Sequence, residues 1–98
     1  MKKDSVIEDI KRAIKPVLKR HNVIKAGIFG SYARGEQNKN SDIDILVKLN
    51  DKAGIIEIIR LKMSLQKATK KKIDLVEYEI IRSEIKDNIL RDEIVILK

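Results

Sequence analysis

The sequence has no cysteine, one proline, one histidine and only three aromatic residues in 98 positions. The absence of cysteine excludes a disulfide framework, thiolate catalysis and cysteine-ligated zinc. His21 has no second imidazole with which to form a metal or catalytic pair, so we expect a structural role for it. Three aromatic side chains offer few platforms on which nucleic-acid bases could stack.

Long apolar runs are also absent, because no stretch of about 18 apolar residues occurs that could span a bilayer. The N-terminal segment MKKDSVIEDIKRAIK is amphipathic and lacks the continuous apolar core of a signal peptide. We therefore expect a cytoplasmic protein with no membrane association. Its length and its hydrophobic content of 43% predict one folded domain over residues 1–98.

The charge is strongly positive, with 22 Lys and Arg against 15 Asp and Glu and a formal net charge of +7. Such a balance favours polyanionic partners such as nucleotides, RNA or an acidic protein surface. A charged fraction of 38% is equally typical of a protein stabilised by surface ion pairs at high temperature, and we give this interpretation more weight. The run KATKKK is interpreted as a solvated helix end, so direct nucleic-acid binding is not favoured.

Hydrophobic periodicity and turn residues predict alternating helices and strands. Asp4 or Ser5 is available as the N-cap of the first helix, and Pro16 is expected to kink or restart it. The alternation predicts an α/β fold, a single layered domain with helices packed on a mixed sheet of about four strands. The expected helices cover residues 5–21, 31–36, 55–70 and 82–92, and the expected strands cover 23–30, 41–49, 71–78 and 93–98.

The apolar stripe of the helix over residues 55–70 is unusually wide. Ile55, Ile58, Leu61, Leu65 and Ala68 mark one face, and Ile56, Ile59 and Met63 widen it. A domain this small is expected to leave part of that stripe exposed.

Two aspartates stand among aliphatic residues in the predicted strand over residues 41–49. Side chains alternate along a strand, so Asp42 and Asp44 share one face, about 7 Å apart at their Cα atoms. Their like charges repel, so one carboxylate is pushed toward protonation unless a cation lies between them. Oxygen-only ligands on a strand suit Mg²⁺ better than zinc.

Three further residues strengthen this interpretation. Asp74 lies in the predicted strand KKIDLVEY, where a third carboxylate can join the pair if the two strands are neighbours. Gly30 permits close backbone approach to a ligand, and Ser31 offers a hydroxyl and a helix N-terminal N–H to a phosphate. Together these parts can bind a magnesium nucleoside triphosphate and align it for in-line attack by a hydroxyl.

The spacing of Gly30-Ser31, ten residues, and Asp42-Ile43-Asp44 resembles the signature of the DNA polymerase β-like nucleotidyltransferase superfamily. The fuller string GSYARGE…SDIDILV is similar to the minimal nucleotidyltransferase (MNT) group over essentially the whole chain. The resemblance implies a palm-like fold in which Gly30 and Ser31 contact the nucleotide and Arg34 contacts phosphate or braces the loop. It also implies that Asp42, Asp44 and Asp74 are the catalytic carboxylates and bind two metal ions.

The same resemblance implies a partner for this chain. Minimal members are commonly paired with a small all-helical HEPN protein, often an RNase toxin, and some silence it by transferring AMP from ATP to a tyrosine. The only histidine is followed by Asn22 and Val23, so the HEPN RNase motif is absent and the chain is expected to be the antitoxin. Glu36 is expected to cap the ARGE loop.

Two alternatives to this activity stay open. The chain can act as a binding antitoxin that occludes its partner, using the apolar helix around Ile56, Ile59 and Met63. It can also transfer a nucleotidyl group to a nucleic acid or a small molecule, because the site chemistry would be shared.

Overall fold

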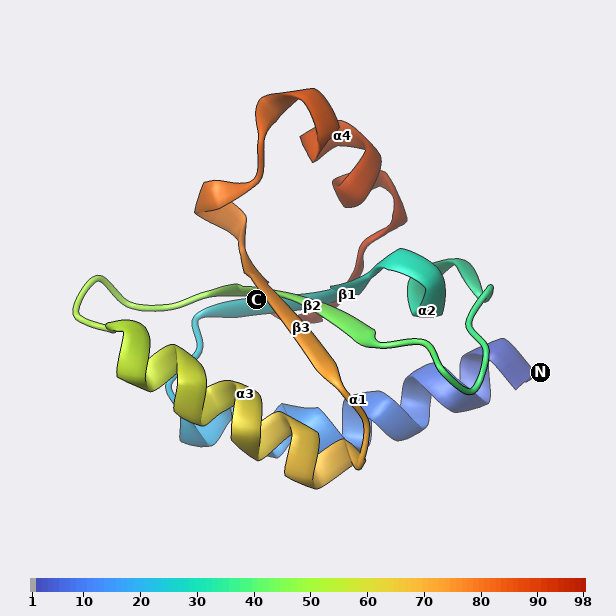
Figure 1. The fold of residues 1–98 in the computed structure, drawn as a ribbon, viewed down its shortest axis with the longest axis horizontal. Coiled ribbons are helices and arrows are strands. Elements are labelled where there is room, and N and C mark those ends of the chain that lie inside the picture. The colour runs from blue at the N-terminus through green and yellow to red at the C-terminus, as the bar shows by residue number, and fades with distance from the viewer. Residues whose placement is uncertain (1) are drawn as a thin grey trace.

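The computed structural model describes residues 2–98. In it the protein forms a four-stranded sheet with helices on both faces (Figure 1). The helices are α1 (Lys2–Arg20), α2 (Gly30–Arg34), α3 (Ile55–Thr69) and α4 (Ser83–Asp92), with a short 3-10 helix, η1 (Tyr78–Ile80). The strands are β1 (Lys25–Phe29), β2 (Ile43–Lys48), β3 (Ile73–Glu77) and β4 (Ile94–Leu97). The predicted alternation of helices and strands is confirmed.

The sheet has the strand order β3-β2-β1-β4. β1 runs antiparallel to both β2 and β4, whereas β2 and β3 are parallel and are joined through α3. A parallel pair needs such a crossover, because a tight turn can join only antiparallel strands. The predicted mixed sheet is therefore confirmed. The C-terminal end of β1 and the N-terminal ends of β2 and β3 lie at the same edge of the sheet.

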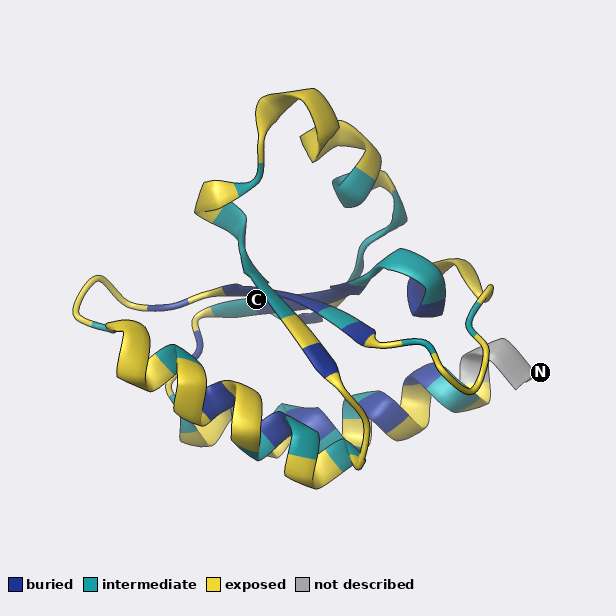
Figure 2. Ribbon diagram, in the orientation of Figure 1, coloured by how far each residue is buried: buried dark blue, intermediate teal, exposed yellow. Residues whose placement is uncertain are grey.

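α1 and α3 lie side by side across one face of the sheet and enclose the main core (Figures 1 and 2). Their amphipathic stripes meet the inward residues of β2, so the buried side chains of all three elements interdigitate. The completely buried members include Ile14, Leu18, Ile43, Ile45, Leu61 and Leu65. No helix within residues 2–98 is both long enough and apolar enough to cross a membrane.

The opposite face of the sheet is covered more thinly. η1 and α4 contribute no buried residue, and Figure 2 shows α4 as mostly exposed. The Tyr78 hydroxyl donates a hydrogen bond to the Glu93 carboxylate, and the Lys25 ammonium lies 4.7 Å from the centre of the Tyr78 ring. These contacts join the two ends of the α4 segment to β1 and leave the N-terminal ends of β2 and β3 uncovered.

Two local expectations for the first helix differ from the structure. α1 begins at Lys2, so Asp4 and Ser5 lie inside the helix and are not its N-cap. Pro16 does not restart α1, which is continuous to Arg20, and the alternative of a kink stays a prediction. Burial of Val17 and Leu18 beside the proline holds this turn against the core and compensates for the missing backbone hydrogen bond.

The outer face of α3 carries the large apolar side chains that the core cannot accept. Ile55, Ile56, Ile59 and Met63 are between 52% and 74% exposed, whereas Leu61 and Leu65 are completely buried. The expectation that the wide stripe is only partly buried is confirmed.

The high charged fraction predicts surface ion pairs, but in the structure arginine forms them and the described lysines do not. Within the side chains that the structure describes, the ion pairs are Arg12 with Asp9 and Arg34 with both Glu36 and Asp92. No described lysine takes part in one. Most of the positive charge is therefore available to solvent or to a partner.

α3 offers a matched pair of substitutions that tests this packing. Leu61→Ala should lower the free energy of unfolding by about 2–5 kcal/mol, because it opens a cavity in the core. Ile59→Ala, on the outer face, should change it by less than about 0.5 kcal/mol. Guanidinium unfolding followed by circular dichroism measures both, and equal losses would contradict the packing described.

Candidate functional site

Asp44 and Asp74 occupy paired positions in the parallel strands β2 and β3. On its other side Asp44 pairs with Phe29, the last residue of β1. Residues in register on adjacent strands project their side chains on the same face, so the two carboxylates are neighbours. The chain leaves the sheet at Gly30, directly beside Asp44.

Both the backbone conformation at position 30 and the close approach of Asp44 require glycine there. Its φ of +72° lies in the left-handed region that favours glycine. A Cβ atom at this position would overlap the Oδ2 atom of Asp44. The start of α2 can therefore approach the carboxylate closely only because this residue has no side chain.

α2 presents its first backbone N–H groups without a side-chain cap, because Phe29 occupies the N-cap position. Ser31 lies in this first turn and is half-buried. Gly35, with φ of +73°, ends the helix, and the Glu36 N–H donates a 2.8 Å hydrogen bond to the Ser31 carbonyl. The turn is ordered, and its first N–H groups are free for a ligand.

The surroundings of Asp44 favour its protonated form. Partial burial, followed by the charge of Asp74 and a hydrogen bond with it, raises the pKa of Asp44 to about 6. Asp42 raises this pKa to a smaller extent. The sequence predicted repulsion between Asp42 and Asp44, but desolvation and the neighbouring strand have larger effects.

Asp42 lies immediately before β2 rather than within it, and it is exposed. The strand begins one residue later because the Ile43 N–H donates to the Lys72 carbonyl, at 2.9 Å. The structure thus brings Asp44 and Asp74 together, with Asp42 close enough to act on Asp44 through its charge.

These carboxylates suit a hard divalent cation. Within residues 2–98 no three carboxylate or imidazole side chains are arranged to hold a metal ion by themselves. Asp44 and Asp74 offer oxygen ligands, and the raised pKa of Asp44 reports negative charge that a cation would neutralise. Mg²⁺ is usually bound by one or two carboxylates together with substrate phosphates, so this donor set fits it.

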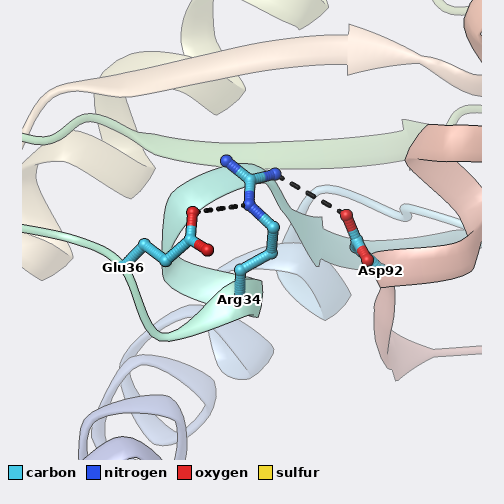
Figure 3. Close-up of polar contacts among 3 residues, drawn as sticks. All are labelled: Arg34, Glu36 and Asp92. Atoms are coloured by element: carbon cyan, nitrogen blue, oxygen red, sulfur yellow. Dashed lines mark hydrogen bonds and ion pairs between the residues drawn. The ribbon is translucent and has the colours of Figure 1, made fainter.

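Arg34 connects the end of α2 to two acidic residues (Figure 3). Its Nε donates to Glu36 at 2.9 Å, and its Nη1 lies 3.6 Å from Asp92 at the end of α4. The hydrogen bond that Arg34 donates to Glu36 raises the pKa of Arg34, and the charge of Arg34 in turn lowers the pKa of Asp44. The expectation that Glu36 caps the loop is wrong, since Gly35 has that position.

The sequence did not single out Tyr78, Asp92 or Glu93. Burial and the hydrogen bond with Glu93 raise the pKa of Tyr78, which keeps the hydroxyl as a donor. The Glu93 carboxylate occupies the space above Gly27 where a side chain would stand. No spacing or periodicity links these positions, because the fold alone brings the two ends of the α4 segment together.

His21 lies outside this cluster. It follows the last residue of α1, and its Nε2 is 3.1 Å from the Ser64 hydroxyl on α3. This contact joins the two helices of the main core face, in line with the structural role expected from the sequence.

The raised pKa of Asp44 predicts how stability depends on pH in metal-free protein. Between about pH 4 and pH 6 the folded state keeps a proton that the unfolded state has lost, so the free energy of unfolding falls as pH rises. Asp44→Asn should remove this component and be the more stable form above pH 6, by about 1 kcal/mol after allowance for partial exposure. Chemical unfolding of both proteins in EDTA at several pH values measures it. Parallel pH profiles would contradict the assignment.

The comparisons with known proteins agree with this geometry. The family described as Polymerase beta, Nucleotidyltransferase matches residues 12–98. A Methanocaldococcus jannaschii protein provisionally named a protein adenylyltransferase is 43% identical over 91 residues, which are 93% of this chain and 98% of that protein. The protein adenylyltransferase MntA of Thermococcus cleftensis is 37% identical over 87 residues, 88% of each chain.

Solved structures share the fold. One, provisionally described as a minimal nucleotidyltransferase, has a TM-score of 0.80 at 27% identity and covers 92% of each chain. A toxin-antitoxin structure with AMP-PNP has a TM-score of 0.76 at 26% identity and covers 88% of this chain and 71% of that one. The shared fold and the match over residues 12–98 place this chain in the polymerase β-type nucleotidyltransferase family, among the minimal nucleotidyltransferases, and it is an enzyme of that class.

Proposed function

We propose that this chain is a Mg²⁺-dependent adenylyltransferase that transfers AMP from ATP to a tyrosine hydroxyl of an all-helical HEPN partner and so acts as its antitoxin. The observation that carries the proposal is the pairing of Asp44 with Asp74 beside the uncapped turn at Gly30 and Ser31. That arrangement joins a metal-binding pair to a phosphate-binding turn in one site.

Each part of the site has a role in the proposal. Gly30 lets the α2 backbone reach the triphosphate, and Ser31 donates its N–H and hydroxyl to phosphate oxygens. Arg34, which is exposed and bonded only to flexible carboxylate side chains, contacts phosphate when nucleotide is bound.

The carboxylates hold the metal and handle the proton. Asp42, Asp44 and Asp74 would hold Mg²⁺, which, when bound, neutralises the charge on the entering and leaving oxygens. The hydroxyl oxygen forms a bond to the α-phosphorus of ATP, the bond to pyrophosphate breaks, and the Asp74 carboxylate accepts the hydroxyl proton. Asp74 suits this role because it is exposed to the incoming group.

Relatives support the choice of nucleotide and acceptor. The Thermococcus relative carries the name protein adenylyltransferase, which implies ATP as donor and a protein as acceptor. The toxin-antitoxin neighbour at 26% identity contains AMP-PNP, an ATP analogue. The HEPN identity of the partner follows from the minimal nucleotidyltransferase resemblance of the motif.

A labelling assay tests the activity directly. Incubation of the chain with α-labelled ATP, Mg²⁺ and the product of the neighbouring gene should label that protein on tyrosine if it is the proposed HEPN partner. Asp74→Asn should reduce the rate by about 10²–10⁴-fold, the usual contribution of a general base. Asp51→Asn, an exposed aspartate in the turn between β2 and α3, is the matched control and should retain full activity. Equal labelling by the two variants would overturn the proposal.

A second candidate function is neutralisation by occlusion, without chemistry. The exposed face of α3 formed by Ile55, Ile56, Ile59 and Met63 favours it, because apolar side chains gathered on one helix face are typical of a protein contact.

The two functions can be separated in cells that express the partner. If occlusion through α3 is sufficient, Ile56→Glu with Ile59→Glu should abolish neutralisation, and an Asp42→Asn, Asp44→Asn, Asp74→Asn triple variant should still protect fully. If AMP transfer is required, the triple variant should fail at equal expression. Growth rate, with expression checked by immunoblot, measures the outcome.

A further inference from the structure

A hollow lined mainly by lysines adjoins the acidic site, and its lysines have no part in the roles described above. Its volume is about 380 Å³, and Asp42 is the single acidic residue in its lining. We call it the lysine hollow, and its lining residues are Lys39, Asn40, Ser41, Asp42, Lys70, Lys71 and Lys72.

Two ordered turns hold the walls of the lysine hollow. On the β2 side the Asn38 N–H donates to the Ser41 hydroxyl at 2.9 Å, and the Ser41 N–H donates to the Asn38 carbonyl at 3.0 Å. On the β3 side the Ile73 N–H donates to the Gln66 side chain at 3.2 Å. The hydrogen bond from Ile43 to Lys72 joins the two walls, so the lysines extend from a fixed backbone.

Lys70 stands where a small residue would be expected. It ends α3 with φ of +59°, a left-handed position usually taken by glycine or asparagine. A side chain in this conformation is strained, because its Cβ atom comes close to the following carbonyl oxygen. The chain nevertheless places a cation there, next to two more lysines, and no described lysine is held by an ion pair.

Residues 70–72 of the lysine hollow and the phosphate-binding turn lie on opposite sides of β2. Gly30 and Ser31 follow β1, whereas Lys70, Lys71 and Lys72 precede β3, and β2 lies between these strands. In-line transfer requires the attacking hydroxyl and the leaving pyrophosphate to be on opposite sides of the α-phosphorus. With the triphosphate against the α2 turn, the hydroxyl enters from the β3 side, where the lysine hollow opens.

We propose that the lysine hollow binds an acidic segment of the acceptor protein, next to the hydroxyl that receives the nucleotidyl group. This inference rests on the proposed function, because it takes the direction of attack from it. Four lysines against one carboxylate give the hollow a net positive charge that complements aspartates and glutamates. The hollow would thereby select the acceptor and orient its hydroxyl toward Asp74.

The surroundings of the hollow favour a protein over a nucleic acid. Binding of single-stranded nucleic acid combines cations with aromatic side chains on which bases stack. None of the three aromatics lines the hollow, Tyr32 is buried, and the Tyr78 hydroxyl is bonded to Glu93. The lysine hollow therefore offers charge without a stacking platform.

The test measures binding without nucleotide, so it does not depend on transfer. ¹⁵N-labelled protein is titrated with a Glu-Glu-Tyr-Glu-Glu peptide and with the matched peptide in which glutamine replaces each glutamate. The acidic peptide should shift the amide signals of residues 39–42 and 70–72, and the neutral peptide should not. Lys70→Gln with Lys72→Gln should raise the Kd about three- to tenfold, the loss expected for exposed charge pairs.

Lys11→Gln with Lys15→Gln is the matched control, because it removes the same charge from a second basic surface, on α1. Its Kd should equal that of the unmodified protein. Equal binding of the two peptides, or an equal loss in both lysine variants, would overturn the inference. Tighter binding of an eight-residue oligouridine with the same dependence on Lys70 and Lys72 would also overturn it and assign the hollow to RNA. Failure of the labelling assay alone would count against the proposed transfer and leave this binding result unaffected.

Discussion

The pairing of Asp44 with Asp74 across adjacent parallel strands concentrates negative charge that the sheet itself cannot neutralise. Partial burial of Asp44, together with the charge of Asp74 and a hydrogen bond with it, raises the pKa of Asp44 to about 6. The large core on the other face of the same strands, where Ile43 and Ile45 are completely buried, offsets the destabilisation caused by the carboxylate pair. A pair of carboxylates in this environment is well suited to a cation accompanied by phosphate, as the proposed function requires.

The two faces of the sheet have different tasks. α1 and α3 bury one face and provide most of the packing, as Figure 2 shows by the buried bands of both helices. The other face has only the exposed α4 segment, which is tied at its ends through Tyr78, Glu93 and the contact of Asp92 with Arg34. Thin covering leaves the carboxylate edge accessible, and Arg34 connects α4 to the turn at which nucleotide is proposed to bind.

Much of the fold could be predicted because periodicity and turn residues act locally. Periodicity and turn residues indicated the four α-helices and the four strands, and Gly30 after an aliphatic run indicated the turn at its end. They did not indicate η1, whose first residue, Tyr78, is predicted to lie in a strand. The incorrect predictions concern the ends of helices and strands. Asp42 precedes β2 instead of lying in it, and α1 starts before its expected N-cap residues. Such boundaries depend on contacts with distant residues, as with the hydrogen bond from Ile43 to Lys72.

The sequence by itself determined which side chains alternate toward the core and which carboxylates share a face, because these follow from the two-residue period of a strand. It also carried the spacing of Gly30-Ser31 and Asp42-Ile43-Asp44, from which the family could be inferred. Only the tertiary structure decided that β3 lies beside β2 in register, so that Asp74 faces Asp44 and Lys70 to Lys72 stand beside Asp42. The pairing of β3 with β2 depends on contacts between residues far apart in the chain, which the periodicity of either segment alone does not specify.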